Sequence, residues 1–71
     1  MNKEKIRMYL NDNKGRRIKF KYNGARNQNE EFIGIIENTY NSIFTIKTED
    51  NNTIKSFSYN DIINESLELF I

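Results

Sequence analysis

Residues 17–24 of this chain read RIKFKYNG, and this stretch decides the class of fold. Three apolar side chains at positions 18, 20 and 22 alternate with basic side chains at positions 17, 19 and 21. Such alternation is the period of a β-strand with one buried and one exposed face. The Asn23-Gly24 pair that follows is a strong turn signal. The segment therefore predicts a half-buried strand with a basic outer face.

A short amphipathic helix is expected before this strand, over residues 3–11. Ile6, Tyr9 and Leu10 recur at helical spacing on one face, and Asn2 is suited to cap the first turn. Gly15 offers the left-handed exit with which helices often end.

Beyond the turn, the pattern predicts four more strands, over residues 30–40, 43–48, 53–59 and 65–71, with a single helical turn over residues 60–63. Gly34 lies inside the first of these segments. A glycine there indicates a bulge or a sharp bend, which small barrels need at their corners.

Five short antiparallel strands in one small domain, residues 1–71, cannot bury an open flat sheet. A sheet that curls into a barrel protects both its faces and its edges. We therefore expect a mainly β fold, a small five-stranded SH3-like or Sm-like barrel over residues 16–71, with the N-terminal helix covering one opening. An OB-fold usually has a helix between its third and fourth strands, and the tight turn over residues 49–52 leaves no space for one.

Composition argues against catalysis and cofactors. The 71 residues contain neither His nor Cys, which removes the commonest general base, the commonest metal ligand and thiolate chemistry. The three glycines are isolated, so a phosphate-binding loop is not expected. No apolar stretch is long enough to span a membrane, and the polar residues that open the sequence lead us to expect no secretory signal. We expect a cytoplasmic protein without enzymatic activity, cofactor or metal.

The charges are segregated along the chain. The first 26 residues hold nine basic and two acidic side chains, whereas the remainder holds two basic and eight acidic ones. Six of the basic residues fall within thirteen positions, and they form the candidate surface for an anion or a nucleic acid: Lys14, Arg16, Arg17, Lys19, Lys21 and Arg26. The alternative is that the two halves pack together and neutralise each other.

Three segments resemble the Veg family over roughly residues 4–70. They are Gly24-Ala25-Arg26, then Gly34 with the run Glu37 to Phe44, then Phe57 to Ile62 with Glu65 to Leu69. The motif residues that carry the resemblance are Gly24, Gly34, Thr39, Tyr40, Ser42, Phe44, Ser58, Tyr59 and Asp61.

The resemblance implies a small cytoplasmic protein of Gram-positive bacteria with an Sm-like barrel. It also implies a role in regulating gene expression and in stimulating biofilm formation, through interference with a transcriptional repressor and without enzymatic activity. A protein partner is then expected, and direct binding of DNA or RNA by the basic strand is the alternative. The family commonly has Arg-Arg-Lys after the first strand, where this chain has Arg26-Asn27-Gln28, which weakens that alternative.

The motif residues also have a purely structural interpretation. Tyr40, Phe44 and Tyr59 suit a barrel core or corner, and Thr39, Ser42 and Asp61 suit turns and helix caps. Tyr9, Tyr40 and Tyr59 are alternatively exposed platforms for stacking bases. Finally, the last strand ends in Phe70-Ile71 without a charged or Pro residue to protect its edge, so a homodimer through that edge is a further expectation. The N-terminal helix is the alternative cover for it.

Overall fold

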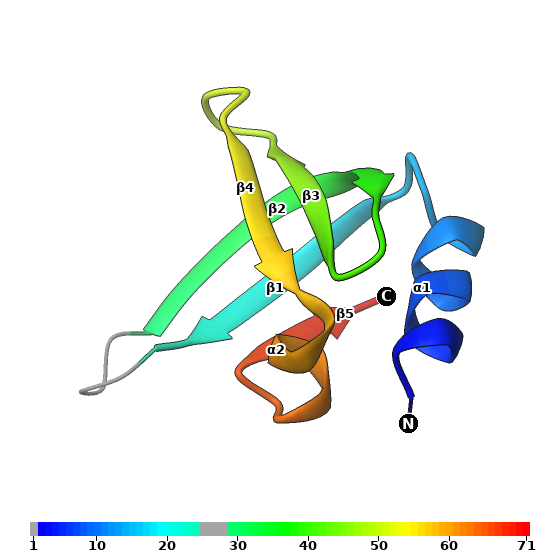
Figure 1. Cartoon of the computed structure of the whole chain (residues 1–71). Coiled ribbons are helices and arrows are strands. Elements are labelled where there is room, and N and C mark those ends of the chain that lie inside the picture. The colour runs from blue at the N-terminus through cyan, green and yellow to red at the C-terminus, as the bar shows by residue number, and fades with distance from the viewer. Residues whose placement is uncertain (1, 25–28) are drawn as a thin grey trace.

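The computed structural model describes residues 2–24 and 29–71 (Figure 1). Its elements run in the order α1 (Lys3–Asp12), β1 (Arg17–Asn23), β2 (Asn29–Thr39), β3 (Ile43–Thr48), β4 (Ile54–Ser58), α2 (Tyr59–Ile63) and β5 (Leu67–Phe70). The prediction of a mainly β fold with five strands and a short N-terminal helix is confirmed.

The five strands form one antiparallel sheet in the order β4-β3-β2-β1-β5. In the described part of the chain β4 and β5 do not pair, so the sheet is not closed. It is nevertheless curled, because β3 and β4 cross over the β1–β2 hairpin (Figure 1). The ring of Phe57 on β4 lies 5.4 Å from that of Tyr22 on β1 and 6.1 Å from that of Phe32 on β2, although these strands are not neighbours. The fold is therefore barrel-like, with its core on the concave face.

The helix α1 covers one end of this core. The Asn2 side chain accepts a hydrogen bond from the Lys5 amide at 2.9 Å, which confirms the predicted N-cap. Ile6 and Leu10 are fully buried, and Gly15 has φ +83°, the left-handed conformation expected at the helix exit. Tyr9, in contrast, is half exposed although it was placed on the apolar face.

The bend of β2 differs from the prediction in its position. The strand is continuous through Gly34, which pairs regularly with Ile18 and Thr48, and the bulge lies further along, between Ile36 and Asn38. Gly34 has a different role. A Cβ atom there would lie 2.5 Å from the carbonyl oxygen of Lys47, so only glycine lets β2 pass this close to β3.

Two strands are shorter than predicted. β4 ends at Ser58, because Tyr59 begins α2, and Tyr59 is fully buried rather than an exposed stacking platform. β5 begins only at Leu67, because Glu65 has φ +63°, which a strand does not allow. The core joins all of these elements, and its buried apolar residues are Ile6, Leu10, Ile18, Phe20, Phe32, Ile36, Phe44, Ile46, Tyr59 and Leu67.

Candidate functional site

The basic strand has the orientation that the sequence predicts. Ile18 and Phe20 of β1 are buried in the core, whereas Arg17 and Lys19 are exposed on the outer face of the sheet. Lys21 is partly buried on the same outer face. The alternation therefore brings three cations together in one row along β1.

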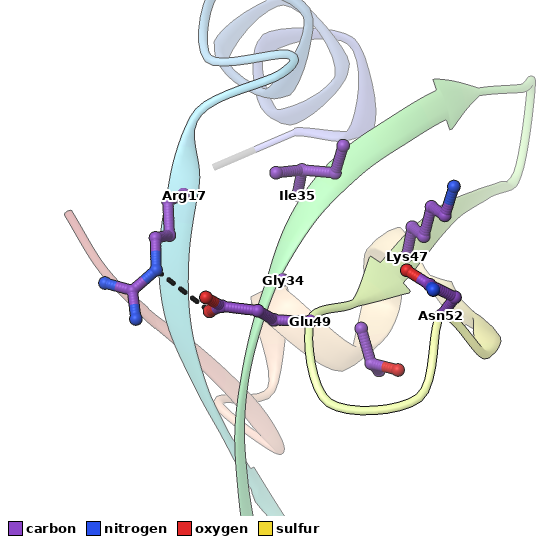
Figure 2. A pocket seen from close by; sticks show the side chains of 7 residues that line it. Arg17, Gly34, Ile35, Lys47, Glu49 and Asn52 are labelled. Atoms are coloured by element: carbon purple, nitrogen blue, oxygen red, sulfur yellow. Dashed lines mark hydrogen bonds and ion pairs between the residues drawn. The ribbon is translucent and has the colours of Figure 1, made fainter.

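Acidic residues of the second half of the chain neutralise this row. Arg17 Nε donates to Glu49 Oε2 at 2.9 Å (Figure 2). Lys19 Nζ lies 3.5 Å from Glu31 Oε1. Lys21 lies between two glutamates in register, Glu31 on β2 and Glu68 on β5. The segregated charges of the two halves thus meet on the outer face of β1.

The remaining members of the predicted basic surface are not part of this row. Lys14 and Arg16 lie in the exposed turn between α1 and β1, where Arg16 donates to the side chain of Asn13 at 3.1 Å. Arg26 lies outside the described residues. The structure therefore does not show the six predicted cations as one surface.

A shallow depression of about 340 Å³ lies beside Arg17 on the outer face (Figure 2). Ile35 of β2 lines it, and the register places Arg17 of β1 and Lys47 of β3 on either side of that residue. Glu49 and Asn52, from the β3–β4 turn, line it as well. Sequence analysis missed Lys47 and Glu49 here, because only the strand register brings them opposite the basic strand.

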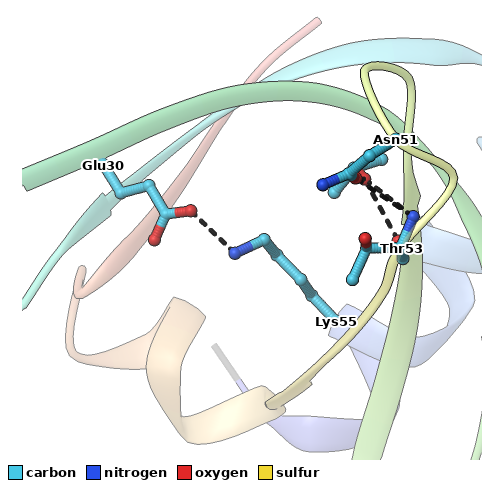
Figure 3. A network of polar contacts seen from close by, with 5 residues as sticks. Glu30, Asn51, Thr53 and Lys55 are labelled. Atoms are coloured by element: carbon cyan, nitrogen blue, oxygen red, sulfur yellow. Dashed lines mark hydrogen bonds and ion pairs between the residues drawn. The ribbon is translucent and has the colours of Figure 1, made fainter.

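The β3–β4 turn holds Glu49 in place. The hydroxyl of Thr48, which is 5% exposed, donates to the Asn51 side chain at 2.7 Å. The amide of Thr53 donates to Thr48 Oγ1 at 3.1 Å and to Asn51 Oδ1 at 3.2 Å (Figure 3). These bonds fix the turn that positions the partner of Arg17.

Two of the three segments that resemble the Veg family meet at Tyr59. Its hydroxyl donates to the carbonyl oxygen of Tyr40, and its amide donates to the carbonyl oxygen of Ser42 at 3.3 Å. Its ring stacks on that of Phe44 with the centroids 5.7 Å apart. Tyr59 therefore anchors the β2–β3 turn to the start of α2.

Other motif residues have capping or bridging roles. Ser58 and Asp61 form a capping box at α2, in which each side chain accepts a hydrogen bond from the backbone amide of the other. The Thr39 hydroxyl donates to the Asn11 side chain at 2.7 Å and so ties β2 to α1. Geometry thus brings together the residues that the sequence placed in two separate segments.

The family described as "Biofilm formation stimulator VEG" matches residues 2–70. The chain belongs to the Veg family. A comparison with curated proteins gives no match. Membership supports a small regulatory protein linked to biofilm formation, in a family that is not catalytic.

Most Veg motif residues in this chain have a structural role. Gly34 permits the close approach of β2 and β3, and Gly24 directly follows β1. The side chain of Tyr40 is different, because it is 50% exposed on a turn whose backbone Tyr59 holds. Tyr40 is therefore a large motif residue whose side chain is available to a partner, next to the exposed Ser42 on the same turn.

A second contact that the sequence did not reveal lies on the concave face of the sheet, between β4 and β2. Lys55 of β4 points to the concave face, where Lys55 Nζ bonds Glu30 Oε1 at 2.7 Å and lies 5.2 Å from the centre of the Phe32 ring (Figure 3). The pair spans the opening between β4 and β2. Only the curl of the sheet brings these two residues together.

Within residues 2–24 and 29–71, acidic side chains do not gather in a group that could hold a metal ion. Neither helix of this region has the length and apolar character that crossing a membrane requires.

Proposed function

We propose that this Veg protein is a non-enzymatic regulator that acts in the cytoplasm by binding another protein. The proposed partner is a regulator of transcription, and the outcome is a change in the expression of genes for biofilm formation. The family supplies the link to biofilm formation. The contact with a protein is our inference.

The neutralised outer face of β1 supports this proposal. Affinity for nucleic acid comes mainly from cations that are free to replace the counterions of phosphates. Here Arg17 and Lys19 are already paired with carboxylates, and Lys21 lies between two glutamates. A DNA backbone would have to displace these acids or lie beside them. A surface of mixed charges with apolar residues between them is more typical of a protein contact.

A pull-down from native lysate, with and without nuclease, tests the proposal. The tagged protein should retain the same partner after DNA and RNA are digested, because the contact is with protein. A matched bait with Tyr40→Ala, which removes an exposed side chain, is expected to retain less of that partner.

The opposite result is a bait whose partners all disappear after nuclease treatment. Binding of purified DNA by the purified protein would then identify the basic strand as a nucleic-acid site, and the proposed protein contact would be rejected.

A further inference from the structure

The strand β4 has a free edge whose direction follows from the hydrogen-bond register. The Thr48 amide donates to the Thr53 carbonyl at 2.8 Å, so Thr53, Lys55 and Phe57 direct their backbone groups at β3. Ile54 and Ser56 then direct their amides and carbonyls away from the sheet. Both residues are exposed, and in the described part of the chain no strand lies beside them.

This free edge, defined by Ile54 and Ser56, is more accessible than the edge of β5. There the Asn23 amide donates to Ser66 at 2.7 Å, which directs the backbone groups of Leu67 and Leu69 outward. Leu67 is only 1% exposed, so other parts of the fold cover that edge where it begins. Both residues of β4 that direct their backbone groups outward, Ile54 and Ser56, are exposed. The strand ends at the capping box of Ser58.

Lys55 determines which strand can pair with this edge. An inward-pointing charge is a device by which natural sheets prevent edge-to-edge association. Two copies could pair their β4 edges antiparallel about a two-fold axis, with Ile54 of each copy hydrogen-bonded to Ser56 of the other. Lys55 would then lie directly opposite Lys55 of the partner subunit. Such a pair without mutual backbone hydrogen bonds is the kind in which the side chains of facing strands lie closest. This symmetric pairing of two β4 edges is therefore disfavoured.

A partner strand with an acidic side chain opposite Lys55 would instead be attracted to this edge. Lys55 has three donors, and Glu30 takes one of them at 2.7 Å. A carboxylate opposite Lys55 on a partner strand would share the ammonium group with Glu30. Two positions further along that partner strand, an apolar side chain would lie beside Phe57, which is only partly buried.

We propose that the free edge of β4 binds an extended segment of a partner protein as a sixth, antiparallel strand of the sheet. The segment carries an apolar residue opposite Phe57 and an acidic residue opposite Lys55. Ile54 and Ser56 supply the backbone hydrogen bonds, and the acidic side chain supplies the specificity. This inference rests on the proposed function, since it assumes that the protein acts by contact with another protein.

A synthetic peptide is the probe, with the sequence Thr-Val-Thr-Glu-Val-Thr and blocked ends. Its Glu is intended for the position opposite Lys55 and its first Val for the position opposite Phe57. Amide hydrogen exchange should slow at Ile54 and Ser56 when this peptide is added. A peptide with Lys in place of Glu should bind about tenfold more weakly or worse, because its Lys would lie directly opposite Lys55.

Methylation of the peptide backbone gives a control that leaves the protein unaltered. A methyl group on the amide of either residue beside the Glu removes a hydrogen bond to β4 and should abolish binding. A methyl group on the amide of the Glu itself, which points away from β4, should leave most of the affinity. Equal effects of the two methylations would overturn the proposal.

Two variants complete the test. Ser56→Pro removes only an outward amide and should abolish peptide binding, whereas Ser56→Ala keeps that amide and should bind normally. Protection that appears at Leu69 instead of Ile54 and Ser56, or none at millimolar peptide, would overturn the assignment to β4. If the native partner resists nuclease but binds the folded Ser56→Pro variant normally, the β4 proposal fails while the proposed protein contact stands.

Discussion

The hydroxyl of Tyr59 donates a hydrogen bond to the carbonyl oxygen of Tyr40, across 19 positions of sequence. The bond leaves the two tyrosines with opposite roles. Tyr59 is fully buried and holds the β2–β3 turn from beneath, whereas the side chain of Tyr40 is half exposed above it. The fold thus uses one motif tyrosine to position the backbone of the other.

Tyr59→Phe should destabilise the fold by about 0.5–2 kcal/mol, because it removes the donor to a carbonyl while the ring keeps its packing on Phe44. A urea melt followed by circular dichroism measures the loss. Tyr40→Phe is the matched control and should leave the melt unchanged, since the structure gives the Tyr40 hydroxyl no role in the fold. Equal losses in both variants would contradict the role assigned to Tyr59.

Gly34→Ala should destabilise the protein by about 1–3 kcal/mol, because the added methyl group would lie 2.5 Å from the Lys47 carbonyl oxygen and 2.9 Å from the Ile46 side chain. Backbone has to move to make room. Thermal melting of the variant checks the prediction.

Gly15→Asn provides the comparison at a glycine with free space. Nothing lies within 4 Å of a Cβ atom at Gly15, and Asn tolerates the positive φ better than other residues. The melting temperature of Gly15→Asn should stay closer to that of the native protein than the melting temperature of Gly34→Ala does. A Gly34→Ala variant that melts at the native temperature would show that β2 and β3 are not packed so closely.

Sequence period was sufficient to predict the elements of the fold but not their exact ends. The alternation around Ile18 and Phe20 reflects burial directly, so β1 and its basic face were predictable. Tyr59 was misplaced because its apolar ring continues the alternation of β4, while the Ser58–Asp61 capping box starts a helix there. At β5, the positive φ of Glu65 is not visible in the residue type.

The candidate site was less predictable than the fold, since it depends on contacts distant in sequence. Charge segregation indicated that acids from the second half could neutralise the basic strand. It did not identify Glu49 and Glu31 as the partners, because strand register and turn geometry select them. The pairing of Lys55 with Glu30 likewise requires the curl of the sheet.

The pairing of charges on β1 leads to a prediction about DNA. A double variant with Glu31→Gln and Glu49→Gln frees Lys19 and Arg17, so its affinity for DNA at low salt should exceed that of the native protein. A variant with Glu4→Gln and Glu65→Gln has the same net charge but leaves these ion pairs intact. Its affinity for DNA should therefore increase less. Fluorescence anisotropy with a labelled duplex measures both.

The salt dependence of DNA binding would reveal the opposite outcome, in which the native protein binds DNA through the cations of β1. Direct phosphate contacts by Arg17, Lys19, Lys21 and neighbouring cations in the native protein would give a log–log slope of about −3 to −4. If the native protein shows that slope, and changing the three residues to Gln removes it, then the ion pairs do not mask the basic strand.

The predicted homodimer through β5 has a geometry that can be tested. Ser66, Glu68 and Phe70 direct their backbone groups at β1, which leaves Leu69 and Ile71 as the accessible outward residues. A two-fold pairing centred on Leu69 places Glu68 opposite Phe70 of the partner subunit and so keeps the two glutamates apart. Phe70 is 49% exposed on the outer face, whereas Leu69 packs against the core.

Phe70→Lys should therefore leave the fold intact and dissociate the dimer, because it places a charge on the surface that the two copies share. Leu69→Lys should instead damage folding, because its charge would point at the core. Light scattering at tens of micromolar gives the mass of the native protein and of Phe70→Lys, and circular dichroism reports the folding of both variants. A native mass of 8.5 kDa, that of one chain, would reject the homodimer.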